Sequence, residues 1–206
     1  MQPVVADPGP LSLRSGFNLV TWAGPSGLEP ASAFAGLGDH LSPAFAFEPE
    51  TEIFSSYGPS RPPFVNDLEA LTYGDGFWAL RGTATAWDQP PAPAPVEVAL
   101  DDGSAVLRIP RGALLAGTDA AAIQIRDASA PEGDPGLTFA LLPEGTVFAT
   151  PATVTFSTST DTPSFIGVLV GADTVELVDV TSVRDAGSRS IVHSASKSSR
   201  VNVHVG

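Results

Sequence analysis

The sequence predicts a mainly β fold in two parts, a small mixed α/β N-terminal module followed by an antiparallel β-sandwich. Three observations lead to this class. Glycine and proline occur 20 times each among 206 residues, which favours short elements joined by turns over long helices. Alternating apolar residues recur in short runs throughout the second half. Between the halves, the proline-rich run WDQPPAPAPVEV predicts an extended spacer over residues 89–95.

The first module, residues 1–88, is predicted to combine strands with short helices. Strands are predicted at residues 16–24, in two runs across 43–58, and at 76–82. In the first strand, Phe17 and Leu19 share one face because strand residues alternate. Short helices are predicted at the alanine-rich residues 28–41 and within 62–76. Asn66 or Asp67 suits the N-cap of the second helix.

The second module, residues 96–206, contains only strand signals. VEVALDDGSAVLRIP gives two alternating runs around Asp102-Gly103, which is a strong hairpin signal. Pro110 then ends a strand because it has no N–H to donate to a neighbour. Further alternating runs follow as far as VNVHV near the end of the chain. About eight short strands at turn-like spacing are typical of a sandwich.

Composition excludes several classes of function. The net charge is −13 and the pI about 4.3, so the chain lacks the basic face that nucleic acid or an anionic membrane surface requires. Without cysteine there are no disulfides, zinc thiolates or thiol nucleophiles. No apolar run is long enough to insert in a membrane as a helix. DDG lacks the spacing of a calcium loop and no His-x-x-x-His pair occurs, so we predict no metal and no cofactor.

Two segments of the second module resemble a known family. GSAVLRIPRGAL at 103–114 and LTFALLPEGTVFATPATVTFS at 137–157 resemble the β-sandwich domain shared by ankyrins, netrin receptors and zonula occludens proteins. Relatives of that domain occur in bacterial surface and secreted proteins. The resemblance covers about half of the chain and implies a β-sandwich that serves in protein interaction.

The first module carries a second resemblance. GFNLVTWAGP, IFSSYGP and YGDGFWAL resemble a small module with a Gly-Trp-Asn-Leu-Val motif, found in multi-domain extracellular proteins of bacteria. Phe17 stands where that module usually has tryptophan. The resemblance implies an extracellular or cell-surface location and no particular activity.

The strongest candidate for chemistry lies in the last strands. Some members of the sandwich family cleave themselves at a His-Phe-Ser sequence, where the serine attacks the preceding carbonyl. Here the sequence is His193-Ser194-Ala195-Ser196, so the residue two after the histidine is Ala195. Ser194 and Ser196 are each one step away, and one step turns a strand side chain to the other face. With no Gly-x-Ser-x-Gly elbow either, we predict that the protein is not an enzyme.

Aromatic residues are the clearest binding candidates. Trp22, Tyr57, Trp78 and Trp87 gather in the first module, where exposed rings would form a carbohydrate platform. A module of this size also needs aromatic side chains for its core, and we favour that role.

We therefore expect a non-enzymatic structural or adhesive module, extracellular or on the cell surface, that contacts a protein partner within a larger protein or assembly. A carbohydrate-binding accessory module is the alternative, and a self-cleaving sandwich is a second alternative.

Overall fold

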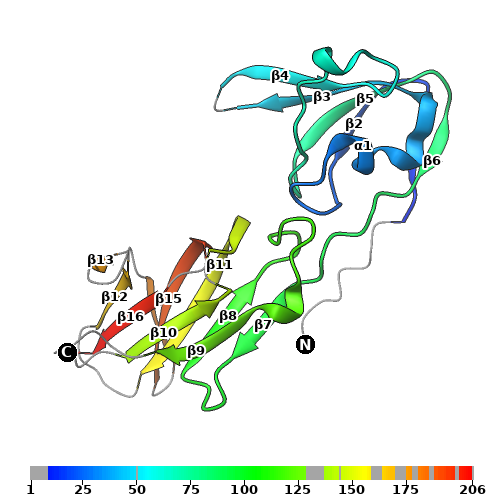
Figure 1. Cartoon of the computed structure of the whole chain (residues 1–206). Helices are drawn as coiled ribbons and strands as arrows, with labels where there is room; N and C mark the ends of the chain where they lie inside the picture. The colour runs from blue at the N-terminus through cyan, green and yellow to red at the C-terminus, as the bar shows by residue number, and fades with distance from the viewer. Residues whose placement is uncertain are drawn as a thin grey trace. The chain divides into compact units, whose positions relative to one another are not determined.

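The computed structural model describes residues 9–49, 51–128, 137–143, 145–158, 164–169, 175–177, 181–185, 188–197 and 200–205. It divides the chain into two compact units, Met1–Pro93 and Ala94–Gly206, so the division falls inside the proline-rich run. Both units consist mainly of antiparallel sheets (Figure 1), which confirms the mainly β prediction.

A four-stranded antiparallel sheet organises the first unit. The strand order is β2-β5-β3-β4, with bounds Gly16–Thr21, Gly76–Arg81, Leu41–Glu48 and Ile53–Tyr57. A separate two-stranded ribbon pairs β1 (Leu11–Leu13) with β6 (Thr85–Trp87). Every strand that the sequence predicts for this unit is therefore present, and the two short strands of the ribbon are additional.

The helical part of the first unit is smaller than the sequence predicts. The segment 28–41 forms the four-residue helix α1 (Pro30–Ala33) and the 3₁₀ segment η1 (Ala35–His40). Gly38 interrupts η1 with a φ of 51°, a backbone angle that glycine adopts at little cost. The helix expected within 62–76 is wrong, because only the 3₁₀ turn η2 (Pro63–Val65) forms there.

The two residues that suggested a helix cap instead bind the end of β4. The side chain of Asn66 accepts a hydrogen bond from the N–H of Gly58 at 3.0 Å. The carboxylate of Asp67 accepts from the backbone N–H of Ser56 at 2.6 Å and from its hydroxyl at 3.2 Å. The Ser56 N–H is the main reason that the pKa of Asp67 lies below its usual value. These partners lie eight and eleven residues back in the chain, so local helix signals do not report them.

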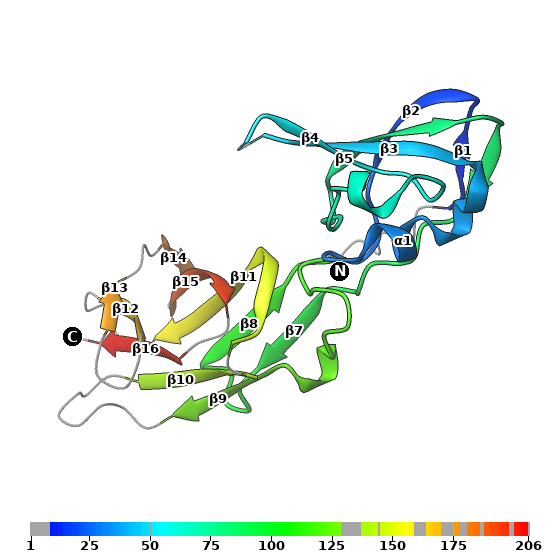
Figure 2. The same cartoon turned by 45° about the horizontal axis from the view of Figure 1, so that its top comes forward.

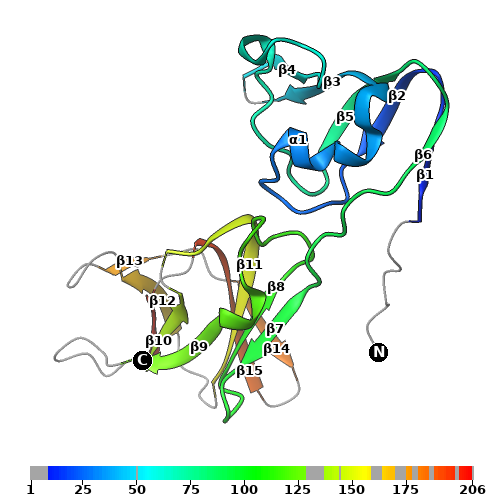
Figure 3. The same ribbon diagram turned by 45° about the vertical axis from the view of Figure 1, so that its right-hand side comes forward.

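The core of the first unit lies against one face of its sheet. Figures 2 and 3 show α1 on this face. The core combines side chains from the sheet, from α1 and η1, and from the loop before β5: Trp22, Phe34, Leu37, Leu68, Leu71, Phe77 and Trp87 are all buried. The ring of Phe34 contacts those of Phe77 and Trp87 at centroid distances of 5.4 and 5.9 Å.

Arg81 is a charged residue within this buried set. Its side chain is only 2% exposed, and Nε and Nη1 have no hydrogen-bond partner in the described part of the chain. Burial lowers the pKa of its guanidinium group.

The second unit contains two five-stranded antiparallel sheets. One has the order β13-β12-β16-β10-β9, and the other β14-β15-β11-β8-β7. The strands are β7 Val96–Ala99, β8 Ala105–Ile109, β9 Gln124–Ala128, β10 Leu137–Leu142, β11 Val147–Thr158, β12 Ser164–Leu169, β13 Val175–Leu177, β14 Thr181–Asp185, β15 Ser188–Lys197 and β16 Arg200–Val205, with a 3₁₀ turn η3 at Ala120–Ala122. Buried side chains from both sheets, such as Leu107 and Phe139, form one core cluster.

Turn chemistry in the second unit follows the sequence. β7 and β8 form the predicted hairpin, and Gly103 in its turn has a φ of 71°. Asp102 accepts hydrogen bonds from the N–H and the hydroxyl of Ser104. β8 ends at Ile109, directly before Pro110.

Candidate functional site

The first unit leaves the second face of its sheet without a covering layer in the described residues. Alternation along the strands decides which side chains lie there. Val20 on β2 and Phe77 on β5 are buried in the core, so their neighbours Leu19 and Trp78 lie on the opposite face. Leu19 is paired with Trp78, and Trp78 in turn with Phe45 on β3. Directly paired residues share a face, so the three form a row across the sheet.

Most side chains of this second face are apolar, and Thr21 and Ser56 are polar residues that pairing and alternation place on the same face. The exposed fractions are 61% for Phe17, 66% for Leu19, 46% for Phe47, 56% for Phe54 and 41% for Trp78. Phe45 and Leu80 are half-buried among them. We call these seven residues the open face: Phe17, Leu19, Phe45, Phe47, Phe54, Trp78 and Leu80.

The aromatic rings of the open face contact one another along the surface of the sheet. Phe17 lies 6.5 Å from Phe45 and 6.3 Å from Trp78, measured between ring centroids. Across the hairpin of β3 and β4, Phe47 and Phe54 are paired and their rings are 4.9 Å apart. Because each ring is held by a neighbour, the surface is formed before any partner arrives, which lowers the entropy cost of binding.

The exposed area of this face is comparable to the largest apolar patch that a typical monomer carries. A large apolar side chain carries roughly 200 Å² of surface, so the five most exposed members leave about 500 Å² in solvent. The largest apolar patch on a typical monomer is about 300–600 Å² and is often functional. A standard interface buries about 800 Å² per partner, of which a little over half is apolar. The open face thus matches the apolar part of one side of an ordinary interface.

Two acidic residues lie near the turn that joins the β3 and β4 ends of the open face, and the unit as a whole is acidic. Glu48 ends β3 and Glu52 lies in the turn that leads into β4. The whole unit Met1–Pro93 contains ten Asp and Glu but only three Arg and no Lys, for a net charge of −7. An apolar surface on a unit of net negative charge is complementary to an apolar patch that carries Lys and Arg at its rim.

The core role that the sequence favours for the aromatic residues is confirmed for Trp22 and Trp87, and the platform alternative is wrong for these two. Trp22 and Trp87 are 0% and 2% exposed and belong to the core, so neither can contact a ligand. Tyr57 is half-buried and stacks on Phe34 at 5.8 Å. Only Trp78 of the four lies in solvent, as part of the open face. Trp22 and Trp87 are buried because their side chains pack in the core that α1 and η1 form against the sheet.

Sequence reasoning did not select most of the open face as a candidate site. It placed Phe17 and Leu19 on one face of a strand and did not identify that face as exposed. The available signal is that GFNLVT and GFWALR carry apolar residues on both strand faces, although a sheet with one solvated face normally alternates apolar with polar residues.

The self-cleavage candidates lie in β15 of the second unit. His193 is paired with Val154 of β11, Ser194 with Thr153 and Ala195 with Ala152, and Ser196 follows in the same strand. The strand placement agrees with the sequence prediction. The side chains of these residues lie outside the described part of the structure, so the proposed lack of cleavage stays a prediction.

Neither a metal-binding cluster nor a membrane-spanning helix occurs among the described residues. There, no group of three or more His, Asp or Glu side chains is placed to hold a metal ion. In the same residues, no helix has the length and apolarity needed to cross a membrane.

Comparison with known proteins gives no guide to function. The chain matches no family model, no curated protein and no solved structure.

Proposed function

We propose that this protein is a non-enzymatic interaction module, extracellular or on a cell surface, whose first unit docks a protein partner through the open face. The observation that carries the proposal is the cluster of exposed apolar side chains, in ring contact with one another, on the face of the sheet that lies opposite the core. The two resemblances in the sequence, to an interaction sandwich and to a module of extracellular bacterial proteins, support the same role.

Charge selects the kind of partner. Two copies of this chain would bring two units of net charge −7 together, and like charges oppose association. We therefore assign the open face to a different protein, one that presents an apolar patch with Lys or Arg at its rim. Contacts of that kind weaken as salt increases because the rim charges are screened.

The test uses two exposed phenylalanines as a matched pair. Phe54 belongs to the open face, whereas Phe64 in η2 is 87% exposed and lies outside it. A photo-crosslinking phenylalanine analogue at each position, in the full chain, is exposed to the surface fraction of the source cells. The crosslinked protein is then purified, and its affinity for unmodified chain is measured.

We expect a partner to crosslink from position 54 and not from position 64. Phe54→Ser should weaken its binding at least about tenfold, the range of an interface hot spot, while Phe64→Ser leaves it unchanged. Equal crosslinking from both positions, or equal affinity of both variants, would refute the assignment. Association of the purified chain with itself, lost on Phe54→Ser, would show that the partner is a second copy.

A carbohydrate-binding function is the second candidate, since Trp78 is exposed. Sugar platforms use flat ring faces, but Phe17 meets Trp78 edge-on at 88° and the rings of Phe47 and Phe54 are tilted by 46°. This geometry favours a protein partner. Binding on a glycan array that Trp78→Ala abolishes without unfolding would support the sugar instead.

A self-cleaving second unit is the remaining alternative. Its test is intact-mass spectrometry of the purified chain. A single species of full mass agrees with the non-enzymatic proposal. Two fragments split at Ser194 or Ser196, absent in His193→Ala, would show that the unit processes itself.

A further inference from the structure

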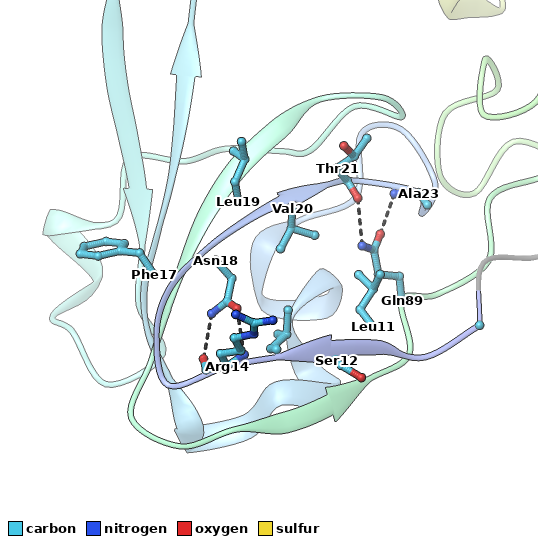
Figure 4. Close-up of a pocket in the computed structure, with 12 residues that line it drawn as sticks. Leu11, Ser12, Arg14, Phe17, Asn18, Leu19, Val20, Thr21, Ala23 and Gln89 are labelled. Carbon is cyan, nitrogen blue, oxygen red and sulfur yellow. Dashed lines mark hydrogen bonds between the residues drawn. The ribbon is translucent and has the colours of Figure 1, made fainter.

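A cleft separates two consecutive strands of the first unit. Only Arg14 and Ser15 join β1 to β2, yet β1 pairs with β6 and β2 pairs with β5. Between β1 and β2 lies a cavity of about 590 Å³ (Figure 4), lined by both strands together with Gly9, Ala23 and Gln89. Its volume lies within the range of small-molecule and peptide pockets.

The backbone of β2 turns a free edge toward this cleft. The N–H of Trp22 donates to the carbonyl of Asp75 at 2.7 Å, so this pair is hydrogen-bonded across to the β5 side. In an antiparallel pair such residues alternate with residues whose N–H and C=O point the other way. The odd-numbered residues Leu19 and Thr21 therefore point theirs away from β5. No described strand pairs with β2 on that side.

Gln89 occupies one end of the free edge. Its side-chain amide donates to the carbonyl of Thr21 at 3.0 Å and accepts from the N–H of Ala23 at 2.6 Å (Figure 4). This contact agrees with the alternation, because it requires the carbonyl of Thr21 to face the cleft. The carboxamide of Gln89 supplies the donor and the acceptor that the backbone of a neighbouring strand would otherwise supply to Thr21 and Ala23.

Asn18 occupies the other end. Its side chain accepts from the N–H of Arg14 at 2.8 Å and donates to the carbonyls of Arg14 and Gly16 at 2.9 and 3.1 Å. It thereby holds the turn between β1 and β2 in place of strand pairing. Between the two carboxamides the N–H and C=O of Leu19 face the cleft.

We propose that the cleft binds an extended polypeptide segment as an added antiparallel strand, in which the C=O and N–H of one residue are hydrogen-bonded to the N–H and C=O of Leu19. A free donor and acceptor on one edge residue recognise an extended backbone, as in strand addition to other sheet edges. The side chain of the hydrogen-bonded residue of the segment shares the face of Leu19. Its two neighbours therefore turn their side chains to the other face, toward Val20, Leu11 and Leu13, which line the cleft, and these side chains are apolar. Flanking Lys or Arg suits the acidic unit. This inference concerns the sheet edge and goes beyond docking on the open face.

The probe is a mixture of seven-residue peptides with lysine at both ends and Val, Ile, Leu, Thr or Phe at the central positions. It is added to the full chain, and amide hydrogen exchange is followed residue by residue. We expect the Leu19 amide to exchange at least about tenfold more slowly with peptide bound, while amides at the outer edge of β4 do not change. Absence of binding at millimolar peptide, or protection only elsewhere, would overturn the proposal.

Two changes remove the central hydrogen bonds from either partner. N-methylation of the central residue of the tightest peptide should weaken it about tenfold, the worth of about 1.4 kcal/mol. Leu19→Pro removes the donor from the protein, and proline is tolerated where a strand N–H faces away from the sheet. Leu19→Ala loses the same side chain but keeps the donor, so it is the matched reference, and Leu19→Pro should bind the peptide about tenfold more weakly than Leu19→Ala does.

The outcomes separate this site from the open face. Phe54→Ser should leave peptide binding unchanged even though it removes docking of the protein partner. If Leu19→Pro does not fold, the N-methylated peptide decides the question on the parent chain. Equal affinity of the N-methylated and parent peptides would refute strand addition and leave the proposed function untouched.

Discussion

The two buried tryptophans of the first unit differ in one hydrogen bond, and that difference has a measurable consequence. Trp22 and Trp87 are both almost fully buried, and their rings are 6.3 Å apart. The indole N–H of Trp22 donates to the carbonyl of Pro25 at 2.9 Å. The indole N–H of Trp87 has no acceptor in the described part of the chain. Replacing either tryptophan with phenylalanine removes the same ring volume. Trp22→Phe also removes a hydrogen-bonded N–H, whereas Trp87→Phe removes an N–H that has no acceptor in the described residues.

The magnitudes can be worked out separately. Each substitution removes about 40 Å³ of side chain, which costs about 1–2 kcal/mol in lost burial and cavity formation. Trp22→Phe also loses a hydrogen bond and leaves the Pro25 carbonyl without its donor, about 1 kcal/mol or more. Trp87→Phe relieves an unsatisfied buried N–H worth about 1–3 kcal/mol, which offsets the cavity. We expect Trp22→Phe to destabilise the unit by about 2–4 kcal/mol more than Trp87→Phe does.

Urea unfolding followed by tryptophan fluorescence measures this difference. All three tryptophans lie within Met1–Pro93, so fluorescence reports on the first unit and not on the second. Each variant keeps two of them as probes. Midpoints are comparable when the slope of the transition is unchanged. Equal destabilisation by the two variants, or a larger loss for Trp87→Phe, would refute the reasoning from the hydrogen bond.

Three further changes test other features of the first unit. Gly24→Ala should destabilise it by about 1–3 kcal/mol in urea titration, because an added Cβ overlaps the indole of Trp22; an unchanged midpoint would contradict the packing. Arg81→Met should raise stability by about 1–2 kcal/mol by removing a buried cation whose Nε and Nη1 lack hydrogen-bond partners in the described residues, and a loss of stability would show that the contacts of the guanidinium group stabilise the fold. Asp67 has a folded-state pKa below its unfolded-state value, so its stabilisation is complete above about pH 4 and is lost as pH falls through the lower folded-state pKa. Asp67→Asn should lower the free energy of unfolding by at most about 1 kcal/mol at neutral pH, since the group is exposed. Below about pH 4 the stability of the variant should depend less on pH than that of the parent chain. The same pH dependence in both proteins would argue against this role of Asp67.

Many of the strands could be predicted because their positions depend on turn residues and on alternation within short stretches of sequence. The Asp102-Gly103 turn places β7 and β8, and Pro110 fixes where β8 ends. Alternation in GFNLVT gives β2 and puts Phe17 and Leu19 on one face. These features depend on the residues in and next to each element, so no partner strand has to be known.

The open face could not be predicted in the same way, because alternation assigns residues to two faces without saying which is covered. That choice depends on α1, η1 and the loop before β5, which all lie on one side of the sheet. Trp78 and Phe77 are adjacent and equally apolar, yet one is 41% exposed and the other 1%. The cleft depends on the pairing of β1 with β6, which lies more than seventy residues away in the sequence. Each of these strands has only three residues, too few for a sequence pattern to indicate the pairing.

The pairing of β1 with β6 also brings the two ends of the first unit together. Leu11 lies opposite Trp87, so the chain enters and leaves the unit at adjacent points. A unit with adjacent ends can be spliced into a surface loop of another protein without pulling that loop apart. The same closeness permits circular permutation, in which a short linker joins the two ends and new termini open in the turn between β3 and β4. Gene duplication could likewise string such units along a chain, each presenting its own open face.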